Sequence, residues 1–268
     1  MQWKRDPDLY PPYLRRRIRQ GRGTGQGMEY RRWLNIRDVP SKGTSSSVGG
    51  IRVQRPYHLL SELEVTYFFL VERRASVIDI REQWPILHVD RTLELCAERG
   101  VTHKYRGLYP EPFTIDFLIT EEMDGKISYR AASIKTPEDA ADPDVRRRLW
   151  VENAWCREHD IFWTLVDTSS FDRTLLDTLR FMRGWFRSRY EPQAGIVERF
   201  ANEFSYQHTT NASLHSVLLS TAKRMCIGND LADNIFRYCA WSSRIPVSLR
   251  HPLLMNRPVV LDSTITNA

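Results

Sequence analysis

The sequence predicts an α/β domain followed by a mainly helical domain. Between His58 and about residue 168, strand-like and helical segments alternate, which is typical of the α/β class. From residue 172 onward helical segments follow one another, whereas the first 57 residues are basic and poor in regular structure. The expected domains are therefore 1–57, 58–168 and 169–268.

The composition of the 268 residues is that of a folded chain. Hydrophobic residues make up 41%, enough for one large core or two modest ones. No segment is long and apolar enough to span a membrane, and charged residues stand where a secretory signal would begin. The four cysteines are too scattered for a zinc pair. We therefore expect a cytoplasmic protein with no membrane association.

Positive charge is concentrated at the N-terminal end. Residues 1–56 hold 13 Lys and Arg against 4 Asp and Glu, whereas the rest of the chain is net negative. Arginine far outnumbers lysine, and its guanidinium binds phosphate with two hydrogen bonds. Double-stranded DNA is thus the expected partner, although a genome that prefers arginine codons is an alternative. The predicted DNA-contacting residues are Arg15, Arg16, Arg17, Arg19, Arg22, Arg146 and Arg147.

The basic segment contains two features of its own. A short helix is expected over Tyr13–Arg19. In Gly21–Gly27 every second residue is glycine, but no strand precedes it and no Gly-Lys-Ser/Thr ends it, so it is neither a dinucleotide nor a P-loop motif. The run either brings backbone close to a partner or acts as a flexible tether.

The α/β region begins with a helix that is apolar nearly all round, Leu59–Arg73, and therefore buried. Two short strands, Val77–Ile80 and Trp84–Leu87, flank Arg81-Glu82-Gln83, which is either a DNA-facing loop or, by preference, an internal ion pair. The later expected elements are a helix over Arg91–Arg99 that ends at Gly100, a helix that starts at Asp142-Pro143 and runs to about His159, and a strand over Ile161–Asp167.

A β-hairpin is predicted over Phe113–Thr120 and Lys126–Ile134, because Asp-Gly between two apolar runs is a strong hairpin signal. A two-residue turn pairs Met123 with Lys126. In that register Asp116 faces Ser133, and Asp116, Ser133 and Lys135 share one face of the sheet.

This juxtaposition is either a salt bridge or a catalytic site. A carboxylate is a ligand for a divalent metal ion, and a fixed lysine beside it can orient a water, as phosphodiester hydrolysis requires. Glu64 is a third candidate. Ser61-Glu62-Leu63-Glu64 fits a capping box, but a carboxylate in an apolar helix also needs a partner. The residues leave a capping role and a ligand role equally open.

The C-terminal region predicts helices over 172–189, 195–204, 211–225 and 229–241, and then a hairpin from Ile245–Leu249 and Val259–Asp262. This order is typical of a winged-helix domain. The last helix carries Asp230 and Asp233 against one arginine, so we expect it to dock a protein rather than read DNA.

Several segments together resemble the TnsA family, the endonuclease subunits of heteromeric, Tn-seven-type transposases. They are His58–Glu64, Val77–Leu87, Thr114–Leu118 and Ser133–Lys135, with weaker agreement at Gly21–Gly27, Trp33-Leu34 and Val39-Pro40-Ser41. The resemblance covers roughly residues 20–168. It implies a restriction-endonuclease-like catalytic domain with a mixed sheet.

The resemblance also implies a function and a set of site residues. The expected reaction is cleavage of the non-transferred strand at the 5′ ends of a transposon, with one or two Mg²⁺ or Mn²⁺ ions. The expected partners are the transposon ends, a TnsB-like transposase and a TnsC-like AAA+ ATPase. The matching positions make Glu64 and Asp116 metal ligands, the Ile134 carbonyl a further ligand, Lys135 the catalytic lysine and Glu152 a supporting acid.

Ser133 departs from the pattern of this nuclease superfamily, which has Glu or Gln two residues before the lysine. Serine is too short to reach the same metal ion, although it can hold a water there. The number of ions therefore stays open. Two alternative functions also stay open: a catalytically weak DNA-binding adaptor, and a stand-alone nuclease of the restriction or repair type.

Overall fold

The computed structural model describes residues 1–34 and 45–262. The chain divides into two compact units, Met1–Ser170 and Phe171–Ala268. Within the described ranges, no helix is long and apolar enough to cross a membrane. The segment Val39-Pro40-Ser41, which contributes to the family resemblance, lies outside the described residues.

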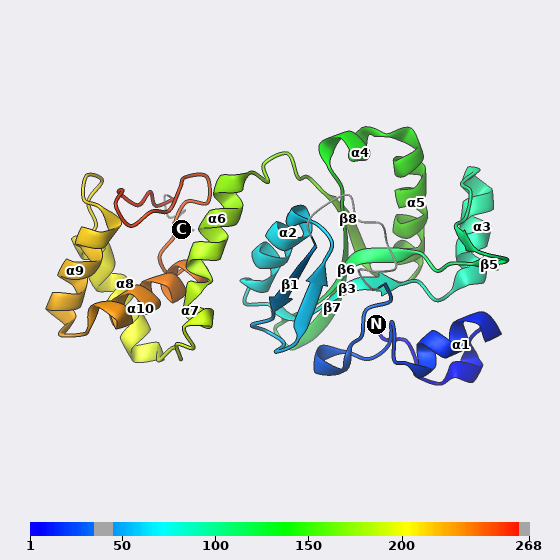
Figure 1. Cartoon of the computed structure of the whole chain (residues 1–268), viewed down its shortest axis with the longest axis horizontal. Coiled ribbons are helices and arrows are strands. Elements are labelled where there is room, and N and C mark those ends of the chain that lie inside the picture. The colour runs from blue at the N-terminus through cyan, green and yellow to red at the C-terminus, as the bar shows by residue number, and fades with distance from the viewer. Residues whose placement is uncertain (35–44, 263–268) are drawn as a thin grey trace. The chain divides into compact units, whose positions relative to one another are not determined.

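The first unit is built on a four-stranded mixed sheet (Figure 1). Its strands lie in the order β3 (Val77–Pro85), β6 (Thr114–Met123), β7 (Lys126–Ile134) and β8 (Phe162–Val166). β6 is antiparallel to both β3 and β7, whereas β8 runs parallel to β7. The predicted hairpin register is confirmed from Met123–Lys126 to Phe117–Ala132. The α/β prediction with a mixed sheet is therefore correct for this unit.

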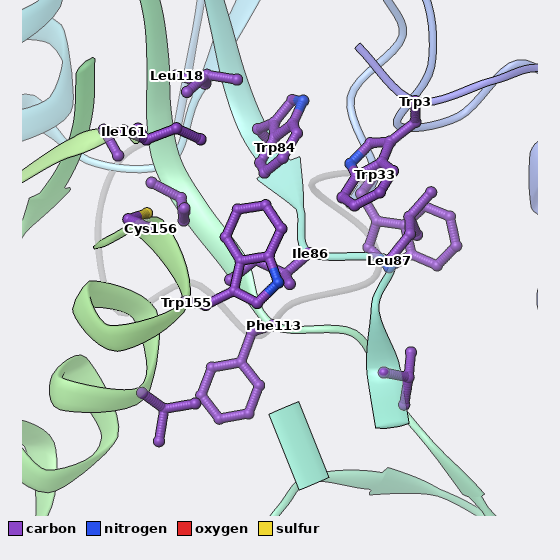
Figure 2. Close-up of a cluster of buried hydrophobic side chains, with 14 of the residues drawn as sticks. Trp3, Trp33, Trp84, Ile86, Leu87, Phe113, Leu118, Trp155, Cys156 and Ile161 are labelled. Carbon is purple, nitrogen blue, oxygen red and sulfur yellow. The ribbon is translucent and has the colours of Figure 1, made fainter. Parts of the chain in front are cut away.

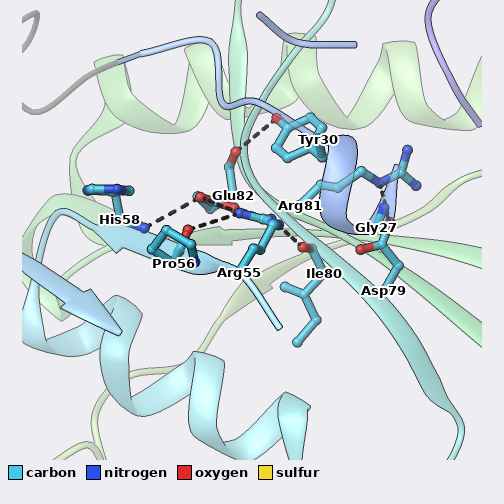
Figure 3. A network of polar contacts seen from close by, with 9 residues as sticks. All are labelled: Gly27, Tyr30, Arg55, Pro56, His58, Asp79, Ile80, Arg81 and Glu82. Carbon is cyan, nitrogen blue, oxygen red and sulfur yellow. Dashed lines mark hydrogen bonds and ion pairs between the residues drawn. The ribbon is translucent and has the colours of Figure 1, made fainter. Parts of the chain in front are cut away.

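β3 corrects one expectation, because it is a single strand rather than two strands around a loop. Its middle residues, Arg81 and Glu82, are 1% and 0% exposed. Glu82 pairs with Arg55 (2.6 Å) and Arg81 pairs with Asp79 (3.4 Å), as Figure 3 shows for the surrounding network. The interpretation of these residues as an internal ion pair is correct, and a DNA-facing loop is wrong.

The helices of the first unit follow local signals. α2 (Glu62–Glu72) begins after Ser61, because β2 (Pro56–Leu59) takes up the first residues of the expected helix. α3 (Val89–Arg99) ends at Gly100 in the left-handed conformation, and α5 (Pro143–Glu158) is capped by Asp142. The remaining elements are η1 (Pro7–Leu9), α1 (Pro12–Arg19), η2 (Gly27–Glu29), β1 (Ser46–Gly49), β4 (Tyr105–Arg106), β5 (Tyr109–Pro110) and α4 (Pro137–Ala141).

The basic N-terminal segment is part of the core. Trp3 stacks on Trp84 of β3 with ring centroids 5.3 Å apart, and its indole N–H donates to the Pro85 carbonyl (2.7 Å). Figure 2 shows Trp3 and Trp33 in one cluster with Trp84 and with Trp155 of α5, whose ring centroid lies 5.9 Å from that of Trp3. The glycine run is held against the same strand, since a Cβ on Gly23 would lie 2.4 Å from Pro85 Cγ. A flexible tether is therefore the wrong interpretation.

The second unit is helical. Its helices are α6 (Arg173–Met182), α7 (Gly184–Arg187), α8 (Ala194–Gln207), α9 (Leu214–Met225) and α10 (Asn229–Trp241). Phe200, Phe204 and Phe236 are fully buried between α8 and α10. The expected C-terminal hairpin is reduced, within the described residues, to one antiparallel bridge between Val247 and Leu261. The winged-helix assignment stays a prediction.

Candidate active site

The central pair of the candidate site is Asp116 and Lys135. Asp116 lies near the start of β6, and Lys135 directly follows the end of β7, so the antiparallel hairpin brings them together. Lys135 Nζ lies 3.0 Å from Asp116 Oδ2, and the same oxygen accepts the Ile134 N–H at 2.7 Å. Thr168 anchors the backbone here, because its hydroxyl donates to the Lys135 carbonyl (2.7 Å).

The Lys135 ammonium contacts two of the expected metal ligands at once. It donates to the Ile134 carbonyl at 2.9 Å as well as to Asp116. The positively charged Lys135 ammonium therefore lies between a carboxylate oxygen and a carbonyl oxygen. Burial lowers the pKa of Lys135, but the carboxylates of Asp116, Glu152 and Glu64 together raise it above its ordinary value, so the side chain stays charged. The salt bridge between Lys135 and Asp116 is therefore part of the same cluster of residues as the predicted catalytic site.

Glu64 stands at the capping position that the sequence suggested, and its role as a metal ligand stays a prediction. Ser61 caps α2 by accepting the Glu64 N–H (3.1 Å), while Glu64 Oε2 accepts the Leu60 N–H (2.9 Å). The Glu64 side chain is buried, and burial together with the Asp116 carboxylate raises its pKa to about 8. Burial is the main cause of this rise, and the negative charge of Asp116 is the second.

Ser133 and Glu152 form a buried pair. The Ser133 hydroxyl donates to Glu152 Oε2 (2.6 Å) and accepts the indole N–H of Trp163 (3.2 Å). Burial raises the pKa of Glu152 to about 7, although Lys135 and the Ser133 hydrogen bond favour the charged form. Where the superfamily pattern has a long polar residue, this chain therefore has a short hydroxyl that is bonded to a carboxylate of α5.

Asp116, Lys135 and Glu152 line a common cavity of about 570 Å³. The cavity wall also includes three cations that sequence reasoning did not assign to the site: Lys104, Arg106 and Arg148. Arg148 had a weak signal as the third arginine of a run, whereas nothing in the local sequence marks Lys104 or Arg106. They reach the cavity only because the β4–β5 hairpin and α5 border it.

The oxygen atoms at this site fit a hard divalent cation. Among the described residues, no three His, Cys, Asp or Glu side chains are grouped closely enough to form a complete metal site by themselves. The available donors are the Glu64 and Asp116 carboxylates and the Ile134 carbonyl, all of them oxygen, the donor type that Mg²⁺ and Mn²⁺ prefer. The Lys135 ammonium already binds two of these three groups, so they accommodate a cation.

The predicted DNA-contacting arginines have different surroundings. Several make contacts within the protein: Arg15 donates to the Tyr10 carbonyl, Arg17 pairs with Glu111 and lies over the Trp33 ring, Arg22 donates to the Trp33 carbonyl, and Arg147 pairs with Asp144. Arg16, Arg19 and Arg146 are exposed. None of the seven lines the cavity that contains Asp116 and Lys135, so their role in DNA binding stays a prediction.

Comparison with known proteins identifies the first unit. Residues 74–168 match the family model described as TnsA-like endonuclease N terminal. The Escherichia coli protein "Transposon Tn7 transposition protein TnsA" is 30% identical over 169 residues, which cover 63% of this chain and 61% of that relative. The chain thus aligns with less than two thirds of the relative's length. Asp116, Lys135 and Glu152 lie within the residues of the family match, so the part of the chain that contains them is similar to TnsA-like endonucleases.

Proposed function

We propose that this chain is a metal-dependent DNA endonuclease that cleaves the non-transferred strand at the 5′ ends of a transposon. The observation that carries the proposal is the cluster in which Lys135 Nζ contacts both Asp116 and the Ile134 carbonyl, within a TnsA-like domain. A carboxylate, a carbonyl and a charged lysine converge at one cavity. Metal-assisted hydrolysis of a phosphodiester can use such groups, because the oxygens hold the ion and the ammonium stabilises charge on the phosphate.

Each residue has a distinct task in this proposal. Glu64, Asp116 and the Ile134 carbonyl would hold Mg²⁺ or Mn²⁺, and a bound ion supplies positive charge that offsets the charge on the attacked phosphate. Lys135 stays protonated and presents its ammonium at the same cavity, where it stabilises the charge that develops in the transition state. Ser133 and Glu152, which are hydrogen-bonded to each other, would support the end of β7 and so position Lys135.

The remaining parts of the proposal concern the assembly. A TnsB-like transposase would cut and join the 3′ ends, and a TnsC-like AAA+ ATPase would connect both subunits to the target. The TnsA-like match supports such an assembly, since the relative is a transposition protein. For the helical C-terminal unit we propose a winged-helix-like role in docking a protein partner, because Asp230 and Asp233 make α10 acidic.

The proposal is tested by replacing Asp116 with asparagine in a reaction reconstituted from the full chain, both partner subunits and transposon-end DNA. Asp116→Asn should abolish cutting of the 5′ ends while 3′-end joining continues, so that simple insertions give way to cointegrates. The matched control is Asp124→Asn, in the turn of the same hairpin. Undiminished 5′ cutting by Asp116→Asn would contradict the assignment of the site.

Two further measurements separate the alternatives. Cutting should require Mg²⁺ or Mn²⁺ and should stop when EDTA is added. A DNA-binding adaptor would bind the transposon ends but leave their 5′ strands intact with either ion and with all partners present. A stand-alone nuclease would cut duplex DNA equally well without the partner subunits.

A further inference from the structure

Lys104 and Arg148 add positive charge to the wall of the cavity that Asp116 and Lys135 also line. Lys104 lies just before β4, and Arg148 lies in the second turn of α5; both line the cavity that contains Asp116 and Lys135. In the described part of the chain, neither side chain forms an ion pair with a carboxylate. Their charges interact, since the Arg148 guanidinium is the main cause of the lowered pKa of Lys104.

Two of the acidic side chains that line the cavity, Glu111 and Glu152, have other polar partners, whereas Asp139 lines it at an exposed position. Glu111, which also lines the cavity, pairs with Arg17 and with Arg106 (3.4 Å). Glu152 accepts the Ser133 hydroxyl and is buried. Arg148 instead lies over the face of Phe113, 5.0 Å from the ring centroid, which fixes its position beside the cavity. Two like charges held together at a cavity wall are unfavourable unless an anion joins them.

We infer that Lys104 and Arg148 form a clamp for a second backbone phosphate of the DNA strand, next to the phosphate that is cut. The inference rests on the proposed function, because the position of the scissile phosphate is set by Asp116 and Lys135. The guanidinium can bind a phosphate through two hydrogen bonds, and the lysine adds a point charge to the same anion. The clamp fixes the register of the strand in the cavity.

Among the three consecutive arginines Arg146-Arg147-Arg148, this inference assigns the phosphate contact to Arg148, whereas the sequence predicted it for Arg146 and Arg147. Arg146 and Arg147 are exposed, and Arg147 is paired with Asp144. Only the third arginine lines the cavity. The helical turn of α5 separates the three side chains, so one faces the site while the other two face water.

The experiment uses transposon-end duplexes in which a single methylphosphonate replaces one phosphate on either side of the cleavage position. This change removes one negative charge and leaves the rest of the strand intact. The complete reconstituted transposase is compared with complexes that contain Lys104→Met or Arg148→Met. Lys126→Met, in the β6–β7 turn, and Arg157→Met, on α5 outside this cavity, remove the same charges elsewhere and serve as controls.

With the wild-type chain, 5′ cleavage should slow by about tenfold to a hundredfold at one flanking position, as expected for loss of a hydrogen bond to a charged group. Lys104→Met and Arg148→Met should slow cleavage of unmodified DNA by a similar factor and then be insensitive to the methylphosphonate at that position. Both controls should keep the wild-type sensitivity. Arg148→Lys, which keeps the charge, should recover part of the rate.

Two results would overturn the clamp while leaving the nuclease assignment in place. One is a wild-type complex that cuts normally whichever flanking phosphate is replaced. The other is a Lys104→Met complex that remains as sensitive as the wild type. A wild-type complex that does not cut the 5′ strand at all would instead overturn the proposed function, and the clamp with it.

Discussion

Replacing Glu64 with glutamine should stabilise the metal-free protein at neutral and alkaline pH. Burial, followed by the Asp116 carboxylate, raises the pKa of Glu64 from 4.5 to about 8. When the pKa of a carboxyl group is higher in the folded chain than in the unfolded chain, the group stabilises the fold fully at pH values below its unfolded pKa. This stabilisation is lost as the pH rises through the folded pKa. The loss for Glu64 therefore falls between pH 4.5 and about 8.

The magnitude follows from these two pKa values. One pH unit of difference corresponds to about 1.4 kcal/mol, so ionisable Glu64 lowers the free energy of unfolding by about 1 kcal/mol at pH 5 and about 3 kcal/mol at pH 7. Glutamine is neutral throughout, and its side-chain oxygen can still accept the Leu60 N–H that reaches Glu64 at 2.9 Å. Glu64→Gln should thus gain about 2–3 kcal/mol at pH 7.

The assay is urea unfolding of the full chain in EDTA at pH 5, 7 and 8, followed by tryptophan fluorescence. Glu122→Gln, at an exposed position of β6, is the control and should change the free energy of unfolding by less than about 0.5 kcal/mol. A Glu64→Gln variant that is destabilised at pH 7, or whose gain is the same at pH 5 and pH 8, would refute the reasoning. The same variant should lose 5′ cleavage, because Glu64 is a proposed metal ligand.

Three further predictions address the lysine and the N-terminal segment. Lys135→Ala should slow cleavage about a hundredfold to a thousandfold while calorimetry still detects Mg²⁺ binding; loss of both together would favour a purely structural salt bridge. Gly23→Ala, at φ +71° and against Pro85, should lower the free energy of unfolding by about 1–3 kcal/mol, whereas Gly27→Ala, which meets no atom within 4 Å, should lose less. Deleting residues 1–22 should lower the melting temperature as well as DNA affinity, because it removes Trp3, Leu14 and Ile18 from the core; an unchanged melting temperature would show that the segment is dispensable for folding.

Local signals in the sequence were sufficient for several elements. Asp124-Gly125 predicted both the hairpin and its register, because a two-residue turn with two positive φ angles leaves one way to pair the strands. Asp142-Pro143 and Gly100 likewise marked a helix start and a helix end, since caps act through neighbouring backbone groups. The approach of Asp116 to Lys135 followed directly from that register.

The family resemblance added roles that the residues alone left undecided. The spacing of the residues could not decide between a capping role and a metal-ligand role for Glu64. In the structure the Ser61 hydroxyl caps the helix, and the Asp116 carboxylate contributes to the raised pKa of Glu64. The importance of Glu152 also had no local signal. Its partner, Ser133, lies on another element, and only the packing of α5 against the sheet joins them.

The sequence by itself thus determined the α/β organisation, the hairpin and the position of the Asp116–Lys135 pair, because these depend on turn chemistry, capping and strand periodicity over short distances. Only the tertiary structure decided that β3 is continuous, since Arg81 and Glu82 are stabilised by Asp79 and by the distant Arg55. It also decided that the basic N-terminal segment belongs to the core and that Lys104 and Arg148 line one cavity. Contacts between residues far apart in the chain depend on how elements pack, and no local pattern encodes that.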